Sequence, residues 1–187
     1  NAKSMNNEEP KTDYIILGAG CFWCTEAVFN RVEGIVGVEV GYSGGEIKNP
    51  SYRQVVSGAT GHVEVAKVTF KPEVISLNEV LEIFWHTHDP TTLNRQGADV
   101  GTQYRSVIFY HSDEQKEIAE ASLQRTDASD LWSDPIVTTI ESERNYYIAE
   151  DYHQDYYEYN KSAGYCSYVI RPKLKKLFKH FENRLKD

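Results

Sequence analysis

Apolar positions along the chain recur with two periods, one typical of strands and the other typical of helices. Runs that alternate apolar and polar positions, or that are apolar throughout, predict strands over residues 13–17, 36–42, 62–70, 104–110 and 136–140. Helices are predicted over residues 22–30, 76–87 and 112–126, in part of 146–159, and from about Pro172 onward. The second and third of these helices open with Ser-Leu-Asn-Glu and Ser-Asp-Glu-Gln, which are sequences that cap a helix start.

The first six elements follow the order strand, helix, strand, strand, helix, strand. This order matches the split βαβ unit, so we predict an α+β protein, a ferredoxin-like α/β sandwich with an additional C-terminal strand and helices. The stretches 46–61, 88–103 and 164–167 are rich in turn residues and are predicted to be loops. Residues 12–187 are expected to form a single catalytic domain, and residues 1–11 a disordered segment or a vector remnant.

Composition narrows the function classes. Hydrophobic residues make up 40% and charged residues 26% of the 187 positions, as in ordinary soluble globular proteins. No apolar run approaches the roughly 20 residues that cross a bilayer, so no membrane partner is expected. A net charge of −8 argues against nucleic acid as a partner, because phosphate binding requires clustered lysine and arginine. The basic stretch 171–179 is interpreted as a solvated helix face rather than a binding site.

The chain has three cysteines, which are Cys21, Cys24 and Cys166. An odd number does not suggest a disulfide scaffold, and the polar N-terminal residues do not resemble a secretion signal. We therefore expect a protein of the reducing cytoplasm, where cysteines with a function are catalytic or redox-active.

Cys21 lies between an apolar run and the first predicted helix, directly after the small residues Gly18, Ala19 and Gly20. The free N–H groups and partial positive charge of a helix start favour a thiolate. We therefore predict that Cys21 has a lowered pKa and is a nucleophile. The alternative is a small buried cysteine that packs as a hydrophobic residue.

Cys24 completes the sequence Cys-Phe-Trp-Cys, which has the spacing of a thioredoxin-type dithiol. On a helix, this spacing places both sulfurs on one face. A disulfide needs specific Cβ geometry, and Cys24 would lie one turn from Cys21 on a stiff helix, so our hypothesis is that Cys24 is mostly structural. Neither a second Cys-x-x-Cys nor a finger-like histidine pair is present, so no metal is expected.

Four further residues could carry chemistry. Glu64 lies on a predicted strand between two valines, and burial there would raise its pKa and let it act as an acid. A solvated carboxylate is the alternative. Asp99 could assist it or form an Asx turn, and Tyr52 and Tyr104 could donate hydrogen bonds or simply pack.

These residues fall within motifs that resemble the A-type methionine sulfoxide reductases. The motifs cover roughly residues 14–173 in the order of that family: Gly-Cys-Phe-Trp with Glu26, Gly-Tyr-Ser-Gly-Gly at 41–45, Pro-Ser-Tyr-Arg at 50–53, Gly-His-Val-Glu-Val at 61–65, His-Asp-Pro-Thr-Thr at 88–92, Asn-Arg-Gln-Gly at 94–97, Asp-Val-Gly-Thr-Gln-Tyr-Arg-Ser at 99–106, Ala-Glu-Asp-Tyr-His-Gln at 149–154 and Gly-Tyr-Cys at 164–166.

The resemblance implies a role for each matching residue. Cys21 would attack the sulfoxide sulfur and become a sulfenic acid, which Cys166 would resolve as a disulfide. Glu64 would protonate the sulfoxide oxygen, and Tyr52 and Tyr104 would hold that oxygen, with Asp99 in support. Phe22 and Trp23 would form the aromatic walls around the substrate methyl group.

The resemblance also implies the substrates and the reductant. The expected reaction is reduction of methionine-S-sulfoxide, free or in oxidised proteins, as repair of oxidative damage. Thioredoxin would reduce the resulting disulfide, no cofactor would be needed, and the protein would act as a monomer. Two alternatives remain, which are a thioredoxin-like disulfide oxidoreductase that uses Cys21 and Cys24, and a non-catalytic module that binds oxidised methionine.

Overall fold

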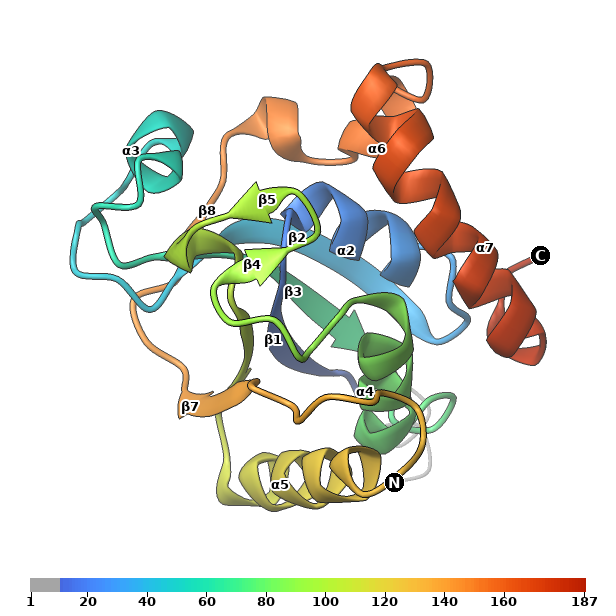
Figure 1. Cartoon of the computed structure of the whole chain (residues 1–187). Coiled ribbons are helices and arrows are strands. Elements are labelled where there is room, and N and C mark those ends of the chain that lie inside the picture. The colour runs from blue at the N-terminus through green and yellow to red at the C-terminus, as the bar shows by residue number, and fades with distance from the viewer. Residues whose placement is uncertain (1–10) are drawn as a thin grey trace, which may run out of the picture.

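A mixed six-stranded sheet forms the centre of the molecule in this computed structural model, which describes residues 11–187 (Figure 1). The strand order is β7-β6-β1-β3-β2-β8. The strands span the following residues: β1 Asp13–Ala19, β2 Ile35–Ser43, β3 Val63–Phe70, β6 Ser106–Tyr110, β7 Thr139–Ser142 and β8 Tyr147–Ile148. A separate small hairpin pairs β4 (Arg95–Gln96) with β5 (Asp99–Val100).

The four inner strands confirm the predicted ferredoxin-like arrangement. Strand β1 pairs antiparallel with both β3 and β6, and β3 pairs antiparallel with β2. Strand β6, the last strand of the unit, therefore lies beside the first strand β1, as the split βαβ order requires. The later strand β7 adds to β6 in parallel, which supplies the additional C-terminal strand.

The helices connect these strands and cover the sheet. Their bounds are α2 Phe22–Phe29, α3 Tyr52–Val56, α4 Leu77–Thr87, α5 Asp113–Asp127, α6 Tyr156–Tyr159 and α7 Arg171–His180, with single turns η1 Thr102–Tyr104, η2 Asp151–His153, η3 Cys166–Ile170 and η4 Glu182–Arg184. Within residues 11–187, no helix combines the length and the apolar character that a membrane crossing demands.

The two faces of the sheet carry hydrophobic cores of different size. The larger core joins one face to helices α2, α4 and α7, and strand β3 contributes Ala66 and Val68 to it. The smaller cluster on the other face includes Val63 and Val65 and is covered by partly buried tyrosines. Side chains alternate along a strand, so Glu64 shares the helix-covered face with Ala66.

Several predicted elements differ from the structure. The stretch predicted as a loop at 46–61 contains the short helix α3, whose start Ser51 caps together with Gln54. The stretch predicted as a loop at 164–167 instead runs into the helical turn η3, so Cys166 lies on a helix that continues into α7. The strand predicted at 136–140 is β7, three residues later. Residues 1–10 of the predicted disordered segment lie outside the described part of the chain.

Candidate active site

The turn between β1 and α2 positions Cys21. Gly20 has a φ of +86°, and a Cβ atom there would lie 2.6 Å from the Gln96 side chain on β4. Only glycine combines that backbone conformation with that close approach. Cys21 then serves as the N-cap residue of α2 without a side-chain capping bond, so its sulfur is not used to hold the helix.

Glu64 lies on β3 next to the start of α2. Its side chain is 1% exposed, and its Oε1 accepts a hydrogen bond from the backbone N–H of Phe22 at 3.2 Å. Its Oε2 is buried and has no hydrogen-bond partner among the described residues. Burial raises the Glu64 pKa to about 8, so the carboxyl group is largely protonated at neutral pH. The free oxygen can therefore present a proton beside Cys21.

The pKa of Cys21 differs from the sequence prediction. We predicted a lowered value, but burial raises the pKa of this thiol, and the neighbouring Cys24 and Glu64 raise it further. The sulfur lies in the protein interior, where the lost hydration of a thiolate outweighs the favourable field of the helix start. The prediction of a lowered Cys21 pKa is therefore wrong.

Cys24 lies next to Cys21 and is coupled to its titration, which a purely structural helix residue would not be. It lies on the same face of α2 as Cys21, and a hydrogen bond from Cys21 is the largest cause that lowers the Cys24 pKa to about 7. The two thiols therefore titrate as a pair rather than independently. Near neutral pH, such a pair holds one proton between its two sulfurs for part of the time.

Tyr52 is the first residue of α3 and Tyr104 the last residue of η1, and both lie near the same charged groups. Burial raises the pKa of both phenols, and the charges of Glu64 and Cys21 add to this effect. Both hydroxyl groups therefore stay protonated and can donate hydrogen bonds. Both phenols therefore lie within electrostatic range of Glu64 and Cys21, and their contact with a sulfoxide oxygen stays a prediction.

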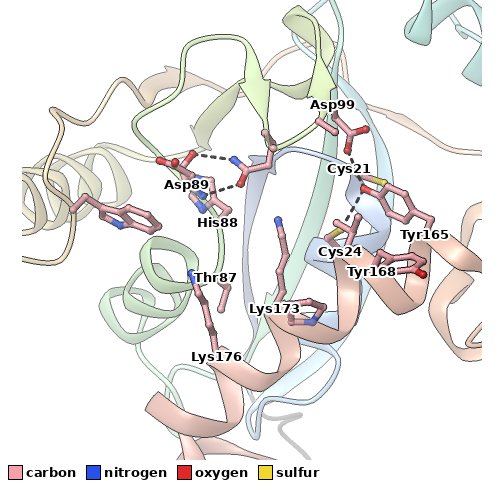
Figure 2. A pocket seen from close by; sticks show the side chains of 16 residues that line it. Cys21, Cys24, Thr87, His88, Asp89, Asp99, Tyr165, Tyr168, Lys173 and Lys176 are labelled. Carbon is pink, nitrogen blue, oxygen red and sulfur yellow. Dashed lines mark hydrogen bonds between the residues drawn. The ribbon is translucent and has the colours of Figure 1, made fainter.

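Asp99 on β5 contacts the site through Tyr165. The Tyr165 hydroxyl group donates to Asp99 Oδ2 at 2.9 Å and lies 3.6 Å from Cys24 Sγ (Figure 2). Tyr165 therefore links the β4–β5 hairpin to the pair of thiols. Sequence reasoning did not single out Tyr165, although it belongs to the Gly-Tyr-Cys motif that we used for the resemblance.

Aromatic rings enclose the first turn of α2. Phe22 is buried, and its ring stacks toward that of Tyr52 at a centroid distance of 6.2 Å. The indole of Trp23 stacks on Tyr156 at 3.7 Å, and its Nε1–H donates to His153 Nδ1 at 3.0 Å. His153 therefore fixes the orientation of Trp23.

Cys166 is buried on η3, and burial raises the pKa of its thiol. It does not line the pocket that Cys21 and Cys24 share. The charge of Cys24 adds to the rise in its pKa, which places Cys166 in the neighbourhood of that thiol. All three cysteines are free thiols in this structure.

A pocket of about 510 Å³ leads from the two thiols to the surface. The β4–β5 hairpin and the preceding loop form one wall, and Tyr165 with η3 and α7 forms the other (Figure 2). Its size is within the usual range for small-molecule sites, which is about 300–1,000 Å³. Within residues 11–187, His, Cys, Asp and Glu side chains do not gather in threes in a way that could hold a metal ion.

The site places a cysteine at a helix start beside a buried carboxyl group that keeps its proton at neutral pH, an arrangement that suits thiol chemistry with an acid partner. Comparison with known proteins identifies the kind of enzyme. The family model described as peptide methionine sulfoxide reductase matches residues 13–185, so the chain belongs to this family of oxidoreductases.

Individual relatives agree with this assignment. The peptide methionine sulfoxide reductase MsrA of Leptospira borgpetersenii serovar Hardjo-bovis is 58% identical over 163 residues, which are 87% of this chain and 92% of the relative. Reduced Mxr1 from Saccharomyces cerevisiae is 40% identical with a TM-score of 0.73, over 85% of this chain and 91% of Mxr1. Mxr1 in complex with Trx2 matches at 30% identity and a TM-score of 0.50, over 80% of this chain and 87% of that one.

Proposed function

We propose that this enzyme reduces methionine-S-sulfoxide, free or in oxidised proteins, through a sulfenic acid on Cys21. The observation that carries the proposal is Glu64, a buried acid that has one unpartnered oxygen and is hydrogen-bonded to the residue after Cys21. A sulfoxide is a poor electrophile until its oxygen is protonated. Glu64 supplies that proton, and Tyr52 and Tyr104 hold the oxygen by hydrogen bonds.

The proposed first step balances with the thiols present. The sulfur of Cys21 attacks the sulfoxide sulfur, and Glu64 transfers its proton to the oxygen. The oxygen moves to Cys21, which leaves methionine and a Cys21 sulfenic acid, and the Cys21 thiol proton restores Glu64. Because Cys24 and Cys21 share a proton, Cys24 can accept the Cys21 proton while Cys21 attacks and then pass it on to restore Glu64.

The proposed second step forms a disulfide. A second thiol condenses with the sulfenic acid and releases water, and a dithiol then reduces the disulfide by exchange. We propose Cys166 as the resolving thiol and thioredoxin as the reductant. Support for the reductant comes from the relative Mxr1, which is known in complex with Trx2. A cycle that returns every thiol to the reduced state suits the reducing cytoplasm, and we propose that the protein acts there. We also propose that it acts as a monomer.

The decisive experiment measures the dithiol-dependent loss of methionine sulfoxide by the wild type and by Cys21→Ser and Glu64→Gln. We expect turnover by the wild type and at least a hundredfold loss in each variant. Full activity of Cys21→Ser would exclude the thiol mechanism, and full activity of Glu64→Gln would exclude the acid role.

The close pair of Cys21 and Cys24 also fits a disulfide oxidoreductase. That function needs no acid, so it predicts that Glu64→Gln exchanges disulfides as fast as the wild type. Mass mapping of the enzyme after one turnover identifies the resolving thiol. A Cys21–Cys166 disulfide is the expected product, and a Cys21–Cys24 disulfide as the main product would contradict the role of Cys166.

A further inference from the structure

Two lysines of α7 line the pocket that leads to Cys21. Lys173 and Lys176 lie one turn apart on the same face of this helix, as residues three positions apart do. Lys173 extends into the middle of the pocket, and Lys176 lies at its edge (Figure 2). The sequence interpretation of this basic stretch as a solvated face therefore holds for Lys175 and Lys176, which are exposed, but not for the half-buried Lys173.

The ammonium groups of both lysines are available for a ligand. Neither forms a salt bridge with a residue of the described chain, whereas Arg31 and Lys161 both pair with Glu158. Lys176 lies over the ring of Trp132 at 5.6 Å from its centroid, which orders the side chain without neutralising it. Lys173 is half-buried, and its charge contributes to the lowered pKa of Cys24.

The acidic groups of the pocket lie on the opposite wall and already have donors. Asp89 Oδ1 accepts from the backbone N–H and the hydroxyl group of Thr91, at 2.9 Å and 2.5 Å. Asp99 accepts from Tyr165. The pocket therefore has a wall with two carboxylates that are hydrogen-bonded and a wall with two ammonium groups that lack an anionic partner in the described chain.

We propose that Lys173 and Lys176 form a carboxylate-binding subsite that selects substrates for the thiol at Cys21. The ligand is a carboxylate of the substrate itself, either the α-carboxylate of free methionine sulfoxide or the side chain of an acidic residue near an oxidised methionine. The pocket of about 510 Å³ adjoins Cys21 and Asp99 and has room for substrate groups beyond the thioether, which the proposed mechanism places outside this lining, against Glu64, Tyr52 and Tyr104. This inference rests on the proposed reduction of methionine sulfoxide and adds a substrate preference to it.

The test compares matched substrates with matched variants. Two peptides carry one oxidised methionine with either glutamate or glutamine at the neighbouring positions, and free methionine sulfoxide is compared with its N-acetyl amide. The variants are Lys173→Met and Lys176→Met, with Lys175→Met as the control on the same helix. The readout is the ratio of kcat/KM for the acidic substrate over its neutral counterpart.

We expect the wild type to prefer the carboxylate-bearing partner in at least one substrate pair, by about three- to fivefold. Each pocket variant lowers this ratio toward one, Lys175→Met does not, and added salt weakens the preference. The peptide pair and the amino-acid pair separate the two sources of the carboxylate. A ratio that stays the same in Lys173→Met and Lys176→Met would overturn the subsite.

The proposed reaction and the proposed subsite are disproved by different results. If the wild type reduces none of the four substrates, the proposed function itself is wrong. If it reduces all four with equal kcat/KM, the reaction stands and the subsite is wrong.

Discussion

Glu26 and Glu64 are both buried carboxyl groups beside helix α2, and the structure uses them differently. Each is 1% exposed, and burial raises the pKa of Glu26 to about 7 and that of Glu64 to about 8. Both oxygens of Glu26 are used, since they accept from the backbone N–H groups of Asp155 and Tyr156 at 2.9 Å and 3.2 Å. Glu64 accepts one such bond and keeps an oxygen free.

This difference shows that burial and a raised pKa do not by themselves mark a catalytic acid. Glu26 joins α2 to the C-terminal segment, including Tyr156, which stacks on Trp23. Its hydrogen-bonding capacity is used to hold the fold. One oxygen of Glu64 has no hydrogen-bond partner within residues 11–187, so a substrate can engage it. The contrast predicts that replacing Glu64 lowers the reaction rate, whereas replacing Glu26 lowers the stability of the fold.

The largest effect is expected for the chemical step of Glu64→Gln. The glutamine keeps the shape of the side chain but cannot donate a carboxyl proton, so the rate of sulfoxide reduction should fall about 10²- to 10⁴-fold. Single-turnover measurements of methionine formation test this. The thermal midpoint should change little, and a rate within threefold of the wild type would remove the distinction between the two carboxylates.

The next effect is a loss of stability in Glu26→Ala. This change leaves two part-buried backbone N–H groups without their acceptor, at a cost of about 1–2 kcal/mol each. We expect the free energy of unfolding, measured by urea titration, to fall by about 2–4 kcal/mol. The folded fraction should still form the Cys21 sulfenic acid. Unchanged stability would show that the C-terminal segment is held by other contacts.

The pH dependence separates the two carboxyl groups further. Only the protonated form of Glu64 is a proton donor, so the rate of the chemical step should fall about tenfold per pH unit above pH 8. Stability follows the same group, because its folded pKa exceeds the usual value of 4.5. The unfolded chain then loses its proton first, and stability should decrease as pH rises from 4.5 to about 8.

Rapid-quench rates from pH 6 to 10 test the first of these expectations, and urea titrations across pH 4.5 to 8 test the second. Glu64→Gln is the control for both. It removes the alkaline fall in rate, and in the stability series it removes the Glu64 contribution and leaves the decrease between pH 4.5 and 7 that Glu26 causes. If this variant keeps the same alkaline fall in rate, the titrating group is not Glu64.

The smallest effect is expected for Glu150→Gln. Glu150 is a partly exposed carboxylate, so it adds a third environment to the comparison of Glu26 with Glu64. Its oxygens accept from the Tyr42 hydroxyl group at 2.8 Å and from the backbone N–H of Tyr52 at 3.0 Å. A glutamine can accept only one of these bonds with its single oxygen, so Tyr52 should be positioned less firmly. We expect kcat to fall about threefold with little change in stability. An effect as large as that of Glu64→Gln would contradict a role in positioning alone.

The arrangement of the sheet could be predicted from local patterns. The alternating apolar stretches at β1, β2, β3 and β6 and the capped helices α4 and α5 gave the correct order, because these signals arise within single elements. The short helix α3 and the helical turn at Cys166 were missed. Each spans only five residues, so its stability depends mainly on packing against the rest of the molecule. The Ser-x-x-Gln sequence at 51–54 was the one local signal for α3, and Cys166 had no such cap.

The sequence alone determined which chemical groups the protein has and the order of the elements that carry them, including Cys21 at a helix start. Only the tertiary structure decided how those groups titrate and which cavity they face. It buried Glu64 so that it keeps its proton, buried Cys21 so that its pKa rises, and directed Lys173 into the pocket. The reason is that desolvation and nearby charges come from residues distant in the sequence, so no local pattern can report them.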